Sequence, residues 1–387
     1  MKRSLIVRKL ARAERALDKA IQNAEIPGAV VQARMPLHGE RVEHLSVQGL
    51  AVVRPERLPM TRQTIFDLAS LTKPMATSTA ILLLVNDGLL DLDDPVAKSL
   101  PAFADRDKEA VTLRQLLTHS SGLRPLRFFH ETLLEKERKT GERLLGTPEG
   151  REWIVDRVLR SALVHEPGEA AVYGDLDFIA LGAVVEAVAR QPLDEFCRER
   201  IFEPLGMPDT RFWPVPAEGF SISIPPEVRR RVAATENCPW RGRILWGEVH
   251  DPNASAMGGV AGHAGLFSTV DDVMRFAEVW LDAWHGRSDL LPPEWVRRFS
   301  ERQHLPEGSD WAIGWDTPTA GASASGRYFS ERSIGHLGFT GTSLWIDLER
   351  EAIVVMLTNR VHLFAKRSRF DLRPVVHDHI IDAFQSG

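Results

Sequence analysis

A serine and a lysine lie three positions apart in Ser70-Leu71-Thr72-Lys73. Side chains at positions i and i+3 share one face of a helix, so this spacing places a hydroxyl beside an amine. A serine hydroxyl becomes a strong nucleophile when a base removes its proton. Lys73 can be that base if burial lowers its pKa, and the apolar stretch 69–90 predicts a buried helix. The pattern by itself is also typical of a surface helix with a solvated lysine.

The second candidate group is Tyr173, one of only two tyrosines in the chain. It follows the turn-forming pair Pro167-Gly168 and precedes the apolar-periodic segment 176–189, so it can project from a loop that leads into a helix. A phenol near a lysine can lose or relay a proton, because the cation favours the phenolate. The alternatives are that Asp175 caps the helix and that Tyr173 is a half-buried packing residue.

A glycine-containing stretch, His336-Leu337-Gly338-Phe339-Thr340-Gly341-Thr342, lies on a predicted strand. Glycine in a strand allows another backbone or a substrate to approach closely. If this strand lies beside the nucleophile, one of its backbone N–H groups can stabilise an oxyanion. A bulge or a bend in the sheet is the simpler alternative.

Together, the three motifs resemble those of the class C β-lactamases, the DD-peptidases and the related family VIII carboxylesterases, members of the serine β-lactamase-like superfamily. The motifs beginning at Ser70, Tyr173 and His336 match in order and in rough spacing. The resemblance covers roughly residues 25–385 and includes the supporting stretches 66–73, 116–123, 262–269 and 338–345. It implies an α+β fold of the β-lactamase/transpeptidase type, with an antiparallel sheet flanked by helices and an inserted all-helical domain.

The resemblance also implies roles for individual residues. Ser70 would attack the acyl carbon and form an acyl-enzyme, while Lys73 and Tyr173 would share the work of general base and general acid. The backbone N–H groups of Ser70 and Phe339 would form the oxyanion hole. Water would then hydrolyse the ester intermediate.

Three residues on the substrate side depart from the β-lactamase pattern. Asp175 stands where asparagine is usual, so it has no amide to donate to a substrate carbonyl. His336 stands where lysine is usual, and a neutral histidine attracts a carboxylate less strongly. Leu337 replaces a hydroxyl residue that helps to hold that carboxylate. Asp175, His336 and Gly338 remain the predicted substrate-binding residues, but the changes disfavour penicillins and D-alanyl-D-alanine termini.

We therefore expect a serine hydrolase that acts on ester or amide bonds of small molecules and is carboxylesterase-like. The alternatives within the enzyme class are a β-lactamase, a D-amino-acid peptidase and a muropeptide amidase acting on cell-wall-derived fragments. The stretches 247–254 and 257–263 resemble a subgroup associated with cell-wall peptides, which favours the last of these. An alternative of another class is a non-catalytic binding protein on the same fold, but such proteins usually lose one of the three catalytic groups.

The sequence gives little reason to expect a metal or a cofactor. His250, Asp251 and His263 are close in sequence, but their spacing fits no common ligand pattern and no His-Glu-x-x-His is present. We expect hydrogen-bonded loop histidines, no metal and no cofactor. Cys197 and Cys238 are predicted to be free thiols, because two isolated cysteines form neither a disulfide framework nor a zinc knuckle.

Composition and net charge limit the classes of partner that the protein is expected to bind. The 387 residues are 43% hydrophobic and 26% charged, with a net charge of −5, so no basic field exists to hold nucleic acid or an anionic membrane. The apolar run Leu5-Ile6-Val7 is too short for a signal peptide, and no apolar run reaches transmembrane length. We expect a cytoplasmic protein whose partner is a small-molecule ester, amide or lactam substrate.

The two ends of the chain differ from its middle. Helical spacing is found in 4–24 and 373–384, and strand-like patterns in 29–35, 42–53, 334–347 and 352–358, whereas the middle is mainly helical. We predict a discontinuous sheet domain formed by residues 1–75 and 245–387, and a mainly helical domain, 76–244, inserted between its halves.

Overall fold

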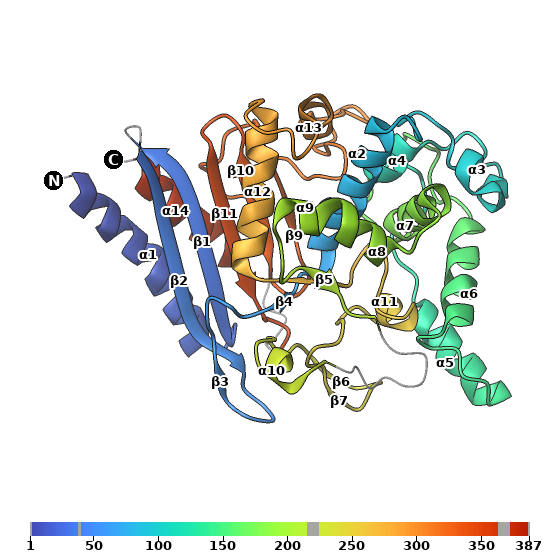
Figure 1. The fold of residues 1–387 in the computed structure, drawn as a ribbon, viewed down its shortest axis with the longest axis horizontal. Helices are drawn as coiled ribbons and strands as arrows, with labels where there is room; N and C mark the ends of the chain where they lie inside the picture. Colours follow the sequence, from blue (N-terminus) through green and yellow to red (C-terminus); the bar gives the residue numbers. More distant parts are fainter. Residues whose placement is uncertain (1, 38–39, 215–223, 363–371, 386–387) are drawn as a thin grey trace.

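The computed structural model describes residues 2–37, 40–214, 224–362 and 372–385 and shows a sheet beside a larger group of helices (Figure 1). The sheet has six strands in the order β3-β2-β1-β11-β10-β9, and each neighbouring pair is antiparallel. The strands are β1 (Gly28–Leu37), β2 (Glu40–Val52), β3 (Leu58–Pro59), β9 (Ser333–Leu337), β10 (Ser343–Asp347) and β11 (Ala352–Thr358). The α+β class and the β-lactamase/transpeptidase-like fold expected from the resemblance are confirmed.

The strand β11 joins the two ends of the chain. It lies between β1 and β10, and Ala29 of β1 is paired with Thr358 of β11. Every residue of β11 is buried, which explains why its sequence is a continuous apolar run rather than an alternating one. The segment predicted as one strand over 334–347 is instead a hairpin, β9 and β10, because the chain reverses between Leu337 and Ser343.

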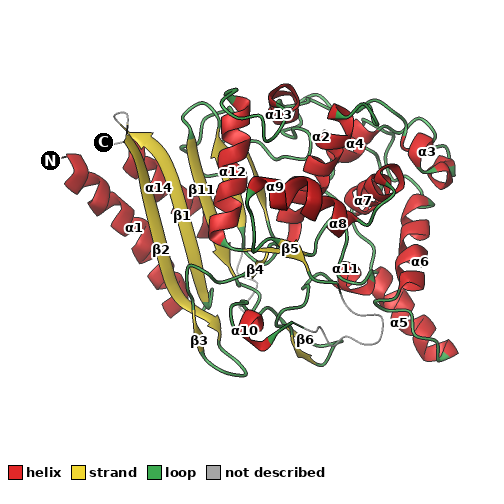
Figure 2. Ribbon diagram, in the orientation of Figure 1, coloured by secondary structure: helices red, strands yellow, loops and turns green. Residues whose placement is uncertain are grey.

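Helices cover both faces of the sheet (Figure 2). The helices α1 (Lys2–Gln22) and α14 (Leu372–Gln385) pack against each other and against one face, where Leu17, Val31 and Ile380 share one apolar cluster. The helix α12 (Val270–Trp284) contacts β1, β10 and β11. The hydroxyl of Thr269 caps this helix and accepts a hydrogen bond from the N–H of Asp272.

The remaining elements lie mainly beside the sheet. The helices are α2 (Thr79–Asn86), α3 (Val96–Ser99), α4 (Leu113–Leu117), α5 (Phe129–Thr140), α6 (Pro148–Leu159), α7 (Leu176–Ala189), α8 (Leu193–Cys197), α9 (Glu203–Leu205), α10 (Pro226–Arg229), α11 (Pro252–Ala256) and α13 (Pro293–Ser300). Two small sheets are formed by β4 (Phe66–Asp67), β8 (Leu266–Ser268) and β5 (Arg211–Phe212), and by β6 (Asn237–Cys238) and β7 (Arg243–Ile244). Because β5 pairs with β8, the predicted domains touch through backbone hydrogen bonds; their boundaries stay a prediction.

The apolar stretch 69–90 is not one regular helix. It begins with a 3₁₀ turn, Ala69–Leu71, continues as a π-helix, Lys73–Ser78, and becomes α-helical only in α2. Pro74 has no backbone N–H to donate, so a regular ladder cannot run through this point. Every residue of the π-helix is buried, as the apolar pattern predicted.

Cys197 and Cys238 are both buried and free. Within the described ranges, no helix combines the length and the apolar character needed to cross a bilayer.

Candidate active site

The segment that carries Ser70 is held in a strained turn. Ala69, the residue before it, has a φ of 48°, a left-handed conformation that costs an L-residue roughly 1–2 kcal/mol. The carboxylate of Asp67 holds the turn, accepting hydrogen bonds from the N–H of Ala69 at 2.8 Å and from the N–H of His250 at 2.6 Å. Asp67 is fully buried, so these bonds are shielded from water.

The amine of Lys73 lies at the centre of the site. Its Nζ atom is 3.0 Å from Oγ of Ser70, 2.9 Å from the hydroxyl of Tyr173, 2.8 Å from Oδ1 of Asp175 and 3.2 Å from the carbonyl oxygen of His263. The structure therefore brings together the serine, lysine and tyrosine that the sequence singled out. Lys73 is completely buried beneath them.

The protonation state of Lys73 differs from the expectation. Burial by itself would lower its pKa, but the charge of Asp175 and the contact with Tyr173 outweigh burial, so the pKa is raised. Lys73 therefore does not meet the condition, a pKa lowered by burial, under which it would act as the base by itself. The reason is the carboxylate of Asp175, which lies 102 positions away in sequence and reaches Nζ from another element.

Tyr173 is positioned by two aromatic neighbours. Its ring packs edge-on against His119, with ring centroids 4.8 Å apart, and stacks on Trp311 at 5.7 Å. The N–H of Gly174 donates to Nδ1 of His119 at 3.3 Å, which ties the loop to the same imidazole. The resemblance had included the stretch around His119 without giving it a role, and the sequence had no signal for Trp311.

A buried carboxyl group supports His119. Burial raises the pKa of Asp177 to about 8, so its carboxyl is protonated at neutral pH. Nδ1 of His119 accepts the Gly174 N–H, and the protonated Asp177 can therefore donate to it across 3.2 Å. Ser121 donates to the other oxygen of Asp177 at 2.5 Å.

The end of β9 lies against the nucleophile segment. Gly338 follows the last residue of the strand, and its N–H donates to the carbonyl of Thr342 at 2.8 Å. A Cβ at Gly338 would lie 2.0 Å from Oγ1 of Thr342 and 2.5 Å from the carbonyl oxygen of Leu68. Glycine is therefore required for the close approach of two backbones. The N–H of the next residue, Phe339, donates to no other group in the described part of the chain.

His336 is a neutral hydrogen-bond acceptor. Burial and the nearby charge of Lys73 lower its pKa to about 3. Its Nδ1 lies 2.8 Å from the carbonyl oxygen of Leu337, so Nδ1 carries the proton and Nε2 keeps a lone pair. That lone pair has no partner within the described residues. His336 thus cannot replace the cationic lysine of β-lactamases, as expected from its type.

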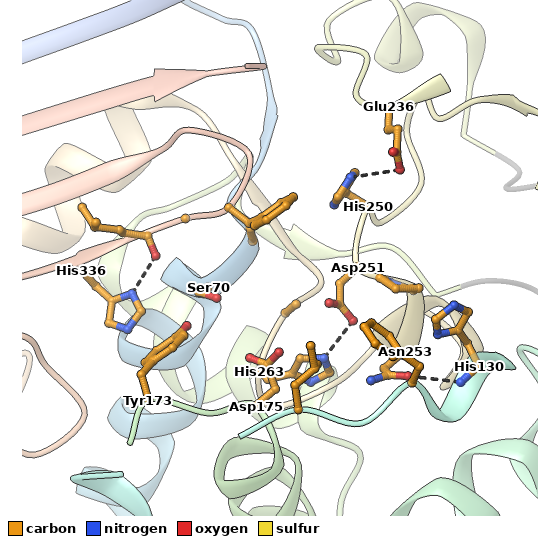
Figure 3. Close-up of a pocket in the computed structure, with 18 of the residues that line it drawn as sticks. Ser70, His130, Tyr173, Asp175, Glu236, His250, Asp251, Asn253, His263 and His336 are labelled. Atoms are coloured by element: carbon orange, nitrogen blue, oxygen red, sulfur yellow. Dashed lines mark hydrogen bonds and ion pairs between the residues drawn. The ribbon is translucent and has the colours of Figure 1, made fainter. Parts of the chain in front are cut away.

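A cavity of about 770 Å³ opens above these groups (Figure 3). Of the predicted site residues, all but the underlying Lys73 line it: Ser70, Tyr173, Asp175, His336, Gly338 and Phe339. Three exposed apolar side chains, Leu126, Phe128 and Phe339, also line it. The cavity is therefore partly apolar, with the reacting groups on one wall.

An arginine that the sequence analysis missed lies beside Gly338. Arg373, in the first turn of α14, donates from Nη1 to the carbonyls of Gly338 at 3.2 Å and Thr342 at 3.3 Å. It is mostly buried but lines the cavity. Nothing in the pattern of the closing helix distinguished this residue from the other surface arginines.

The three clustered loop residues, His250, Asp251 and His263, all line the cavity. Asp251 and His263 lie with Asp175, and one ligand-capable atom from each is within 4.8 Å of the others. Nε2 of His263 is hydrogen-bonded to Oδ1 of Asp251 at 2.9 Å, whereas His250 lies 3.4 Å from Glu236. The loop histidines therefore do form polar contacts, but the close group of three around His263 includes Asp175 and not His250.

Comparisons with known proteins identify the family to which the chain belongs. The Beta-lactamase family matches residues 10–376. A protein of Escherichia coli K12 named "Putative D-alanyl-D-alanine carboxypeptidase" is 33% identical over 330 residues, which cover 81% of this chain and 73% of that protein. A protein of Salmonella enteritidis with the same name is 32% identical over 328 residues, covering 78% and 71%.

Two solved structures share the fold. One is EstCE1, a hydrolase with promiscuous acyltransferase activity, at a TM-score of 0.71 and 23% identity, covering 97% of this chain and 99% of that one. The other is a penicillin-binding protein homologue from Caulobacter crescentus, at 0.70 and 19% identity, covering 98% of both chains. The family match along most of the chain and the identity to the E. coli protein show that this chain is a serine hydrolase of the β-lactamase family.

Proposed function

We propose that the protein hydrolyses ester or amide bonds of small molecules through an acyl-enzyme on Ser70, with a carboxylesterase-like preference. The observation that carries the proposal is the contact of one buried Nζ, that of Lys73, with both the Ser70 and the Tyr173 hydroxyl oxygens. A binding protein on this fold has no need of that arrangement, since it desolvates a lysine for no gain in ligand contact.

The raised pKa of Lys73 assigns the roles. An ammonium has no lone pair, so Lys73 cannot by itself take the proton of Ser70. In the proposed step, Lys73 gives one of its protons to the phenolate of Tyr173 and takes the proton of Ser70 in its place. Lys73 therefore remains an ammonium. The Ser70 oxygen bonds to the acyl carbon, and the Tyr173 proton passes to the leaving group as the scissile bond breaks. Lys73 stabilises the negative charge on the tyrosine oxygen throughout.

The backbone N–H groups of Ser70 and Phe339 are proposed as the oxyanion hole. Both residues line the cavity, and the N–H of Phe339, which has no partner among the residues that the structure describes, follows the strand end that Gly338 brings against the nucleophile segment. Water then attacks the acyl carbon, and the proton removed from it follows the same route through Tyr173, returning to Ser70 as the acid is released.

The shape and charge of the cavity favour esters with apolar parts. Leu126, Phe128 and Phe339 offer exposed apolar surface to the substrate, and His336 brings no positive charge for a lactam carboxylate. The test is hydrolysis of 4-nitrophenyl acetate and butyrate, with nitrocefin in parallel, by the wild type and by Ser70→Ala. We expect ester hydrolysis that depends on Ser70 and exceeds nitrocefin hydrolysis.

A fluorophosphonate probe supplies an independent readout, because it labels an activated serine whatever the natural substrate is. The wild type should be labelled and Ser70→Ala should not. Equal labelling of both proteins, or labelling of neither with no ester turnover, would contradict the proposal and favour the non-catalytic alternative.

A second candidate is a D-alanyl-D-alanine carboxypeptidase or a related enzyme that acts on cell-wall fragments. The observation that favours it is Arg373, whose guanidinium lines the cavity beside Gly338 and could hold a terminal carboxylate. The names of the E. coli and Salmonella relatives point the same way. Release of D-alanine from a diacyl-lysyl-D-alanyl-D-alanine peptide, at a rate above ester hydrolysis and lost in Arg373→Gln, would select this candidate over the esterase.

A further inference from the structure

Two carboxylates face the cavity on the side of Ser70 away from His336. Asp175 begins the segment that leads into α7, and Asp251 precedes α11, yet their carboxylate oxygens and a nitrogen of His263 all lie within 4.8 Å of one another. Figure 3 shows His336 and Tyr173 to one side of Ser70, and Asp251 and His263 to the other. Asp175 lies far in the chain from Asp251 and His263, so the fold is what brings the two acids together.

Each acid of the pair accepts hydrogen bonds from a different neighbour. Oδ1 of Asp175 accepts from Lys73, whereas Oδ1 of Asp251 accepts from His263 and from the N–H of Ala254. Burial opposes ionisation of Asp251, but His263 and the helix N–H outweigh burial and lower its pKa. Asp251 is thus a carboxylate, and within the described chain the side chains in hydrogen-bond contact with the two acids are Lys73 and His263.

The imidazole of His263 is a second sign of a ligand-binding site beside the two acids. It is 1% exposed and lines the cavity between its neighbours. Its Nε2 is bonded to Asp251, but its Nδ1 has no hydrogen-bond partner in the described part of the chain. A buried polar atom without a partner is costly, and here it belongs to a ring that already contacts the acid pair.

The geometry suits an ammonium better than a metal ion. Two oxygens that both accept hydrogen bonds of about 2.8 Å from one ammonium, at a tetrahedral angle, lie about 4.6 Å apart. The limit of 4.8 Å on the distances within this group allows that separation. Ligands of a tetrahedral zinc ion lie only about 3.4 Å apart and are not hydrogen-bonded to each other. Nε2 of His263 and Oδ1 of Asp251 are hydrogen-bonded at 2.9 Å, and Asp175 already binds one primary ammonium, that of Lys73.

We infer that the natural substrate carries a primary ammonium on its acyl part, held between Asp175 and Asp251. This inference rests on the proposed function, in which Tyr173 protonates the leaving group and so places it on the side of Tyr173 and His336. The acyl part must then extend from Ser70 towards the two acids. The substrate class is therefore an ester or amide of an amino acid, rather than of a simple fatty acid.

The experiment compares benzyl esters whose acyl parts all have three carbons: D-alanine, L-alanine, β-alanine and propionate. Release of benzyl alcohol at pH 7 gives kcat/KM for each. We expect at least one amino ester to exceed benzyl propionate by about tenfold or more, the discrimination expected for a charge-assisted hydrogen bond of 1.4 kcal/mol or more. The preferred ester also shows whether the site binds an amine on the α-carbon or on the β-carbon of the acyl part, and, for an α-amine, whether it prefers the D or the L configuration.

Asp251→Asn tests the acid directly. Asparagine is as good a helix cap as aspartate, so α11 should be retained while the negative charge is lost. The ratio of kcat/KM for the preferred amino ester over benzyl propionate should fall about tenfold. The matched control is Glu135→Gln, which removes one negative charge from the exposed face of α5 and should leave the ratio unchanged.

The outcomes separate this inference from the proposed function. If benzyl propionate is hydrolysed as fast as every amino ester, or only 4-nitrophenyl acetate is cleaved, the ammonium site is overturned and the Ser70 mechanism stands. If neither class of ester is cleaved in a Ser70-dependent way, both fail. Loss of the amino-ester preference after chelation, with recovery on adding Zn²⁺, would instead assign the acids to a metal and overturn the inference.

Discussion

Nζ of Lys73 lies closer to Oδ1 of Asp175, at 2.8 Å, than to Oγ of Ser70, at 3.0 Å. The acid that replaces the usual asparagine is therefore an ion-pair partner of the lysine before it is a substrate-binding residue. Its negative charge compensates for the cost of burying an ammonium. The ion pair with Lys73 and the proposed binding of substrate therefore depend on the same side chain, and this dependence can be tested.

We predict that Asp175→Asn lowers the pKa of Lys73, because the charge that raises it is removed while burial, which lowers it, remains. If the ammonium is the active form, the basic limb of the pH profile of kcat/KM moves to lower pH. Initial rates with 4-nitrophenyl acetate between pH 6 and pH 10, corrected for spontaneous hydrolysis, measure this limb.

Asp271→Asn is the control for this profile, since it removes an acid that pairs with Arg62 on the surface. Its profile should match that of the wild type. A basic limb that stays in place in Asp175→Asn would show that Lys73 does not titrate in the profile.

We predict that Asp177 makes the protein less stable as the pH rises. The pKa of Asp177 is raised by burial from 3.8 to about 8, so the folded state binds more protons than the unfolded state between these values. Its contribution is intact below about pH 4 and is lost as the pH rises through about 8, with a slope of up to about 1.4 kcal/mol per pH unit.

Asp177→Asn mimics the protonated side chain, because its amide can donate to His119 while its oxygen accepts from Ser121. The difference in the free energy of unfolding between the variant and the wild type, measured by urea titration from pH 5 to pH 9, should grow in favour of the variant. A constant difference over this range would mean that Asp177 is ionised throughout.

We predict that Asp67→Asn loosens the nucleophile turn. Its two oxygens accept from Ala69 and His250, and an amide in place of one oxygen would turn an N–H towards another N–H. The cost should be about 1–3 kcal/mol of unfolding free energy. The fall in kcat/KM should exceed the fall expected from the unfolded fraction alone, and an active variant with wild-type kcat would show that the strained turn is held by other contacts.

We predict that Gly338→Ala reduces kcat/KM by about 100-fold or more, because the new methyl group would force the end of β9 away from Leu68 and shift Phe339. Adding Thr342→Ala removes one of the two clashes, so it should recover part of the stability but little of the activity. Full recovery in the double variant would mean that the contact with Leu68 is unimportant for the reaction.

Local patterns predicted the elements better than they predicted the chemistry. The spacing of Ser70 and Lys73 placed the two side chains together, and the apolar pattern correctly indicated burial. The sign of the pKa change at Lys73 could not be predicted from these patterns, because it depends on Asp175, which no local pattern connects to the lysine. Likewise, only the fold could bring Asp251 to Asp175.

Other differences come from backbone geometry. The stretch 334–347 has the composition of one strand, but a positive φ of 104° at Gly341 turns it into a hairpin. Arg373 and Trp311 gave no signal, since each reaches the cavity through tertiary packing alone. The resemblance, rather than periodicity, selected Phe339 from among equivalent loop residues.

The order of the strands also fixes when the protein can first become active during its synthesis. The N-terminal strand β1 pairs with β11, so Ala29 must wait for Thr358 to leave the ribosome before the central ladder can close. The hairpin that carries His336 is on the far side of that last strand. A nascent chain that already holds Ser70, Lys73 and Tyr173 therefore cannot close this sheet before β11 has been translated, and contacts over such sequence separations make folding slow.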